Sequence, residues 1–135
     1  MKHDEFIGQV QHRARLSSRG AAERATRATL ETLAERLSGG EAKDLAAQLP
    51  PEIGEHLRGS WSAIGDRFSL DEFFERVSRR EGADLPDAVF HARVVIEVLR
   101  EAVSKGEMDD IRAQLPAEFD RLIEVWSRGH MPVAE

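Results

Sequence analysis

The sequence predicts an all-α protein, a pseudo-twofold helical bundle built from two copies of a three-to-four-helix unit. The main observation is a repeated block, because residues 38–53 read SGGEAKDLAAQLPPEI and residues 104–119 read SKGEMDDIRAQLPAEF, 66 positions later. A second observation is that DEFI at 4–7 recurs as DEFF at 71–74. Apolar residues are also spaced three and four apart, which is the helical period. Two units are too few for a solenoid, so we expect each to cover the apolar face of the other.

The first helix of each unit is marked by a short apolar stripe. Phe6, Ile7 and Val10 share one face of a helix over about 4–14. The equivalent helix covers about 70–80 and begins with the same Asp-Glu-Phe sequence.

The second helix is the longest, over about 19–37 and 86–103. Pro86 suits the first helical turn, where its missing N–H costs nothing. The 86–103 helix is apolar on most of its sides, so we expect it to be buried on most sides, either at the centre or at a subunit contact.

The third helix is short, over about 41–49 and 107–115. A Ser-x-x-Glu capping box begins at Ser38, Ser69 and Ser104. Each short helix ends at Leu-Pro, because the residue before proline is disfavoured in the helical region.

A fourth helix then follows over about 51–58 and 117–127. The predicted organisation is a single helical domain over 1–135, with repeat one at about 3–58, a linker at about 59–68 and repeat two at about 69–128. The linker contains Trp61, Ile64 and Phe68. Because flexible linkers are not this apolar, we expect it to pack on the core.

Composition limits the class of protein. There is no cysteine, which excludes disulfides and thiolate metal sites, and the formal net charge is −6. The first residues lack the apolar run of a signal peptide, and no apolar stretch approaches the roughly 20 residues of a membrane span. We therefore expect a cytoplasmic protein with no membrane partner.

Gln48 and Gln114 recur inside the repeated block, which indicates a shared task. They form a candidate cleft if the two amides flank a ligand on the pseudo-axis. The favoured alternative is structural, with each amide satisfying the carbonyls left free where Leu-Pro ends its helix.

Carboxylates recur as well. Glu41, Asp44, Glu107 and Asp110 could form a metal cluster, but their place near helix N-termini favours a simpler role as partners of the helix dipole. No zinc-protease, nucleophile or phosphate-loop motif is present. We therefore predict that the protein is not an enzyme, has no catalytic residue, and binds no metal or cofactor.

The strongest binding signal is a basic edge in the first repeat. Its members are Arg13, Arg15, Arg19, Arg24 and Arg27. Acidic residues dominate the C-terminal half, and this asymmetry favours self-association or an acidic partner. Nucleic acid is the less favoured alternative, because no aromatic residues interleave with these arginines. A plain solvated face is the simplest interpretation of the edge. Glu31, four residues after Arg27, is expected to pair with it along the helix.

The sequence AERLSGGEAKDLAAQLP at 34–50, following DEFI at 4–7, resembles the bacterial domain-of-unknown-function family 2267. The resemblance covers nearly the whole chain, including AQLP at 113–116. It implies a small bacterial helical protein and supplies no reaction.

Together these observations predict an uncharacterised, non-catalytic helical protein that self-associates or binds a protein partner, with a homodimer as the expected form. The alternative is an anion- or nucleic-acid-binding protein that uses the basic edge.

Overall fold

The computed structural model describes residues 1–58 and 65–127, and all regular structure in these residues is helical. The all-α prediction is therefore confirmed. The helices of the first part are α1 (His3–Arg13), α2 (Arg19–Arg36), α3 (Gly39–Ala47), α4 (Pro51–Gly54) and the 3-10 helix η1 (Glu55–Leu57). The second part has α5 (Leu70–Glu81), α6 (Leu85–Ala102), α7 (Lys105–Ala113), the 3-10 helix η2 (Ala117–Phe119) and α8 (Asp120–Ser127).

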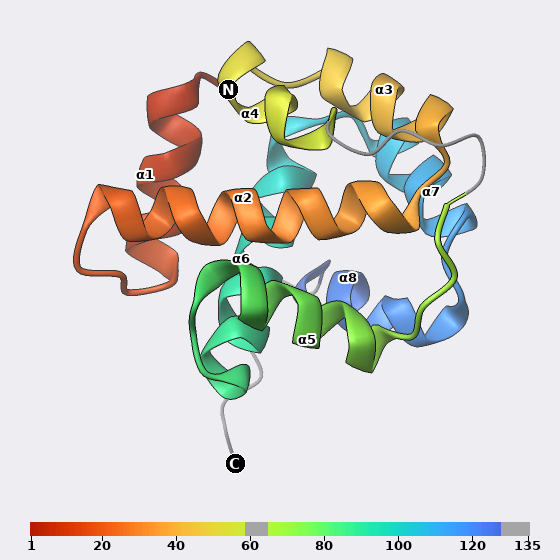
Figure 1. Ribbon diagram of the computed structural model, residues 1–135. Coiled ribbons are helices and arrows are strands. Elements are labelled where there is room, and N and C mark those ends of the chain that lie inside the picture. The colour runs from red at the N-terminus through yellow and green to blue at the C-terminus, as the bar shows by residue number, and fades with distance from the viewer. Residues whose placement is uncertain (59–64, 128–135) are drawn as a thin grey trace.

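The long helix α6 is the centre of the bundle. It packs against α1, α2, α5 and α8. Figure 1 shows α2 running across the molecule with α5 beside it, while α3 and α4 lie on the opposite side of α2 from α5. Of the two places predicted for α6, the structure therefore supports the central one, because helices of the same chain cover its apolar sides.

The core is one continuous cluster drawn from both halves of the chain. Phe6 on α1 and Phe73 on α5 are both fully buried. The ring of Phe73 makes edge-to-face contacts with Phe74 and Phe119, each at a centroid distance of 5.9 Å. Equivalent phenylalanines of the two halves thus contribute to the same interior.

The cap serines begin four of the helices. The hydroxyls of Ser18, Ser38, Ser69 and Ser104 each accept the backbone N–H three residues later. The short helices α3 and α7 begin two residues earlier than predicted, because a helix starts directly after its cap serine.

The fourth helix differs between the halves. Over 51–57 it is one α-helical turn followed by a 3-10 turn, and over 117–127 a 3-10 turn precedes the longer α8. Both begin directly after the Leu-Pro pair, as expected.

The chain returns from the linker along the C-terminal end of α2. A Cβ on Gly65 would lie 2.2 Å from the carbonyl oxygen of Arg36, so this close approach requires glycine. The Nε of Arg36 donates to the carbonyl of the buried Phe68 at 2.9 Å. Packing of the linker on the core is confirmed for Phe68, whereas Trp61 and Ile64 lie outside the described residues.

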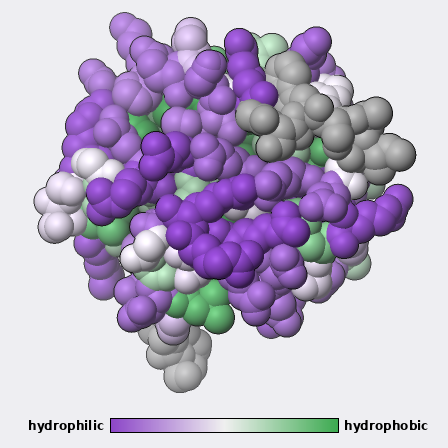
Figure 2. All heavy atoms as spheres, in the orientation of Figure 1, coloured by the Kyte–Doolittle hydropathy of each residue, from purple (hydrophilic) through white to green (hydrophobic). Residues whose placement is uncertain are grey.

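The described surface is mostly polar. Its exposed large apolar side chains are Met1, which precedes α1, and Leu85, the first residue of α6. On the face in Figure 2, hydrophilic residues predominate and the apolar areas are small and separate. Within residues 1–58 and 65–127, no helix is both long and apolar enough to cross a membrane.

Candidate functional site

The arginines of the predicted basic edge have different surroundings. Arg13 on α1 reaches α6, where its Nη1 lies 2.7 Å from Glu97 Oε1 and 2.8 Å from Glu101 Oε2. Arg19 forms an ion pair with Asp4. Carboxylates of the same chain therefore already neutralise these two guanidinium groups. Arg13 joins α1 to α6, and Arg19 joins α2 to α1.

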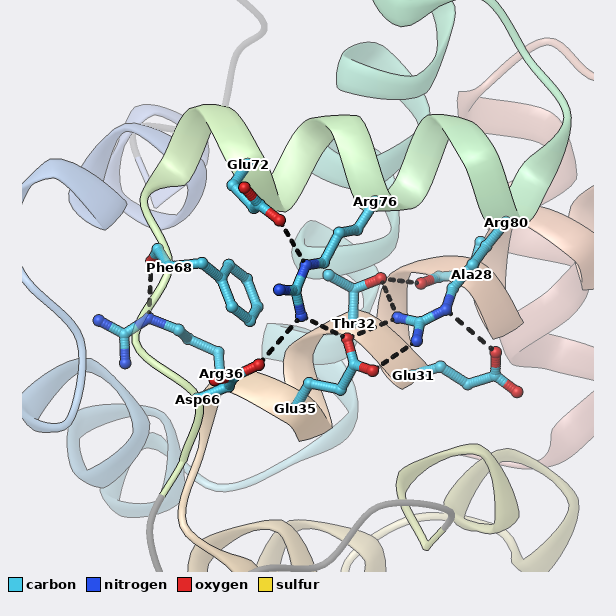
Figure 3. A network of polar contacts seen from close by, with 10 residues as sticks. All are labelled: Ala28, Glu31, Thr32, Glu35, Arg36, Asp66, Phe68, Glu72, Arg76 and Arg80. Carbon is cyan, nitrogen blue, oxygen red and sulfur yellow. Dashed lines mark hydrogen bonds and ion pairs between the residues drawn. The ribbon is translucent and has the colours of Figure 1, made fainter.

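A matching network joins α5 to α2 (Figure 3). Arg80 Nη2 lies 2.6 Å from Glu35 Oε2, and Arg80 Nε lies 3.8 Å from Glu31 Oε1. Arg76 Nη1 lies 3.0 Å from Glu35 Oε1, and its guanidinium covers the ring of Phe68 at 3.9 Å. These two arginines, with the hydrogen bond from Arg80 as the largest cause, lower the pKa of Glu35.

This α2–α5 network borders a hollow of about 290 Å³ lined by Glu35, Glu72, Arg76, Arg79 and Arg80. Glu72 also binds Arg76, with 3.0 Å between Arg76 Nε and Glu72 Oε2. Arg76 and Arg80 are therefore neutralised by these carboxylates, whereas Arg79 lines the same hollow without an ion pair among the described residues.

Arg24 and Arg27 lie in a different hollow, of about 400 Å³, between α1, α2 and the α4–η1 segment. Its lining residues are His3, Ile7, Gly20, Glu23, Arg24, Arg27, Glu52 and His56. Both arginines are exposed and form no ion pair with another residue that the structure describes. The predicted pair of Arg27 with Glu31 is not formed, because Glu31 faces Arg80 of α5.

Two histidines complete this hollow. Burial, more than any neighbouring charge, lowers the pKa of His56, so its ring is neutral at pH 7 and can donate one N–H. His3 Nε2 lies 4.0 Å from Glu23 Oε2. The hollow therefore offers two guanidinium groups and two imidazoles, together with the two carboxylates of Glu23 and Glu52.

Arg15 lies apart from this pair. It has a left-handed backbone, with φ 56°, in the loop after α1 and lines an open hollow with His12 and Gln11. The predicted basic edge is thus not one continuous surface.

Gln48 and Gln114 contact the opposite repeated block. Gln48 Oε1 accepts the backbone N–H of Ser104 at 2.8 Å, and Gln114 Oε1 accepts the backbone N–H of Ser38 at 3.1 Å. The amides therefore bind free N–H groups at the start of the other short helix. They do not bind the carbonyls of their own helices, as the favoured alternative held, because α3 and α7 pack against each other.

This exchange brings a group of carboxylates together at the α3–α7 junction. One carboxylate oxygen each of Glu41, Glu107 and Asp110 lies within 4.8 Å of the other two. Glu107 is only 7% exposed. Burial first, and then Glu41, Asp44 and Asp110, raise the pKa of Glu107 to about 8. The helix dipole contributes about 0.3–1 kcal/mol and cannot offset the burial of an ionised carboxylate. Dipole complementarity is therefore not a full account of these residues.

A contact of His91 was also missed at the level of sequence. His91 Nδ1 makes a short contact with Glu81 Oε2, joining the end of α5 to α6. Both side chains are nearly buried. His91 has no equivalent in the first repeated unit, where Ala25 occupies the position, so the repeat pattern gave no signal for this pair.

The fold and these contacts define the class as a small all-α bundle whose halves are joined by ion pairs and by amide-to-backbone hydrogen bonds. Residues 3–122 match the family described as "Uncharacterized conserved protein (DUF2267)". The chain belongs to this family, which confirms the resemblance seen in the sequence. No curated protein matches the chain.

Proposed function

We propose that the protein is a non-catalytic helical binding module that takes an anionic group into the hollow lined by Arg24 and Arg27. The observation that carries this proposal is the contrast within the basic edge. Arg13 and Arg19 are neutralised by Glu97, Glu101 and Asp4, whereas Arg24 and Arg27 line a hollow of about 400 Å³ without an ion pair among the described residues.

The chemistry of the hollow supports a small oxyanion. Arginine presents a planar set of donors that matches phosphate or carboxylate, and each imidazole can add one N–H donor. The carboxylates of Glu23 and Glu52 reduce the net charge of the hollow. We therefore expect a compact anion held between the two arginines rather than a long polyanion.

We also infer that the bundle is a pseudo-twofold arrangement of two copies of one unit. Three equivalent pairs of contacts support it. The Arg13 contacts with Glu97 and Glu101 correspond, by the offset of the repeat, to the Arg80 contacts with Glu31 and Glu35. The hydrogen bonds of Gln48 and Gln114 are exchanged in the same way.

Self-association was the other predicted function, and the apolar surface of α6 no longer supports it. The apolar sides of α6 that suggested a subunit contact pack against helices of the same chain. A homodimer stays a prediction, which sedimentation velocity at several protein concentrations would test.

The anion proposal is tested by titrating the full chain with inorganic phosphate at low ionic strength in a calorimeter. We expect saturable binding that weakens by roughly tenfold or more in R24Q/R27Q, because each charge-assisted contact contributes about 1.5–3 kcal/mol. The matched control is R79Q/R121Q, which removes the same two charges from exposed positions outside this hollow. Equal weakening in the control, or no saturable binding by the unchanged protein, would overturn the proposal.

A duplex DNA of random sequence separates a small-anion site from a nucleic-acid surface. We expect the duplex to bind more weakly than phosphate and with a small salt dependence, because steep salt dependence requires many phosphate contacts. Tight duplex binding lost in R24Q/R27Q would favour the nucleic-acid alternative instead.

A further inference from the structure

The two glutamates at the α3–α7 junction are left without their expected partners. In a capping box, the glutamate three residues after the cap serine accepts the backbone N–H of that serine. Here the N–H of Ser38 is taken by Gln114, and the N–H of Ser104 is taken by Gln48. Glu41 and Glu107 are therefore released from capping and face each other between the helices.

The released oxygens are buried. The Oε2 atoms of Glu41 and Glu107 are buried and accept no hydrogen bond from another group in the part of the chain that the structure describes. A hydrogen bond between the two carboxyl groups themselves forms only when one of them is protonated. Glu107 is more than nine-tenths buried as a residue. Once ionised, a carboxylate in this position requires a positive partner, because an unpaired buried charge is costly.

The surrounding charges add to this requirement. Asp110 lies one helical turn after Glu107, and its carboxylate joins the same group within 4.8 Å. Asp44, the equivalent residue on α3, acts on Glu107 as a further negative charge. The amide of Gln114 donates weakly to Glu41, at 3.4 Å from Nε2 to Oε1, which leaves Glu41 Oε2 unused.

The donor atoms indicate which partner fits. Three carboxylate oxygens from two helices, with no histidine among them, form the hard oxygen set that Ca²⁺, Mg²⁺ and Mn²⁺ prefer. The Gln48 and Gln114 contacts hold the two helices in place on either side of this group.

We propose that Glu41, Glu107 and Asp110 bind one hard divalent cation that ties α3 to α7. This site lies at the junction of the two repeated blocks, and its residues do not line the Arg24–Arg27 hollow. The proposal is thus independent of anion binding. Two glutamates from different helices would share the ion, so binding it would strengthen the contact between the halves.

The test uses the full chain after treatment with a chelator, titrated with Mn²⁺ and followed by the loss of the free-ion electron paramagnetic resonance signal. We expect one equivalent to bind, and Ca²⁺ to compete for it. The ion should also raise the thermal unfolding temperature, because a ligand of the folded state stabilises it.

Variants assign the ion to this site. E41Q/E107Q should abolish Mn²⁺ binding. D110N should weaken it by roughly 10–100-fold or more, because losing a direct ligand costs at least as much as losing an outer-shell partner of a ligand. The matched control is D109N, which removes the neighbouring carboxylate that pairs with Lys105 and lies outside the group. Since amide replacements relieve buried negative charge, these variants should remain folded, which circular dichroism would check.

Two results would overturn the proposal. One is that the unchanged protein binds no Mn²⁺ and no Ca²⁺ at millimolar concentration, which would mean that a proton shared between Glu41 and Glu107 satisfies the pair. The other is that D109N weakens Mn²⁺ binding as much as D110N does.

Discussion

Glu35 on α2 and Glu107 on α7 are both carboxylates at a contact between helices of opposite halves, yet the charges around them have opposite signs. Glu35 lies between Arg76 and Arg80, which lower its pKa. Glu107 lies among Glu41, Asp44 and Asp110, and its pKa is raised to about 8. Glu35 therefore stabilises its contact as an anion, whereas Glu107 destabilises its contact when it is ionised.

The difference shows how a helix contact can be built around charge in two ways. In the α2–α5 network, each carboxylate is neutralised by residues that the chain itself supplies (Figure 3). At the α3–α7 junction, the hydrogen bonds are made by neutral amides, and the carboxylates are left to find a proton or a cation. A contact whose charges are paired within the chain needs no ligand, whereas a contact with unpaired carboxylates can bind a proton or a cation.

The largest expected effect comes from removing the apolar support next to the junction. Leu49 and Leu115 are buried directly before the prolines, beside Gln48 and Gln114. Leu49→Ala and Leu115→Ala should each lower the free energy of unfolding by about 2–5 kcal/mol in urea titrations. Leu85→Ala is the control, because Leu85 is exposed and should change stability by less than about 0.5 kcal/mol. Losses of that small size at Leu49 would mean that this face does not pack as described.

The second prediction concerns the carboxyl group of Glu107 and is measured in the metal-free protein with a chelator present. A raised pKa means that the folded state holds a proton more tightly than the unfolded chain does. The stabilising effect is complete below the ordinary carboxyl value of 4.5 and is lost as the pH rises through about 8. Glu107→Gln should remove this dependence and stabilise the protein above pH 8 by on the order of 1–3 kcal/mol. Stability of the unchanged protein that rises steadily from pH 5 to 8 would contradict this description of the junction.

The third prediction has the opposite sign of pH dependence. Because the pKa of Glu35 is lowered, its contribution is present above the ordinary carboxyl value of 4.5 and is lost as the pH falls through the lowered value. R76A/R80A should cost about 1–2 kcal/mol at pH 7, since the pairs are only partly buried. Arg79→Ala serves as the control, because Arg79 is exposed and lies outside the ion pairs found among the described residues. An equal loss in all these variants would show that the pairing with Glu35 does not matter.

The smallest effect on stability is expected for the amides of Gln48 and Gln114, each of which contacts the opposite repeated block. Gln48→Ala and Gln114→Ala each remove the acceptor of one helix-start N–H, which water can partly replace because both contacts are exposed. Each should cost about 0.5–1 kcal/mol in thermal or urea unfolding. Gln9→Ala, which removes a part-buried contact to Arg13 within α1, provides a comparison with a contact that does not cross between halves. If the double variant Q48A/Q114A costs no more than either single one, the two amides act as a coupled pair.

The sequence by itself determined which segments form helices and placed their starts within two residues of those observed. The apolar period, the cap serines and the Leu-Pro pairs act over a few residues, so they can be interpreted without the fold. The repeated block also indicated correctly that Gln48 and Gln114 share a task and that the carboxylates of the short helices recur together. The resemblance to a family likewise rested on local motifs, and the family match over residues 3–122 agrees with it.

Only the tertiary structure decided which of these polar groups meet. Arg13 and Glu101 are separated by 88 positions and Gln114 and Ser38 by 76, so no local pattern could pair them. The packing of α1 on α6, of α5 on α2 and of α3 on α7 set those distances. That packing neutralised part of the basic edge, left Arg24 and Arg27 in a hollow, and buried Glu107 among other carboxylates. The physical reason is that the interaction between two charges depends on the distance between them in space. The order of residues along the chain does not give that distance.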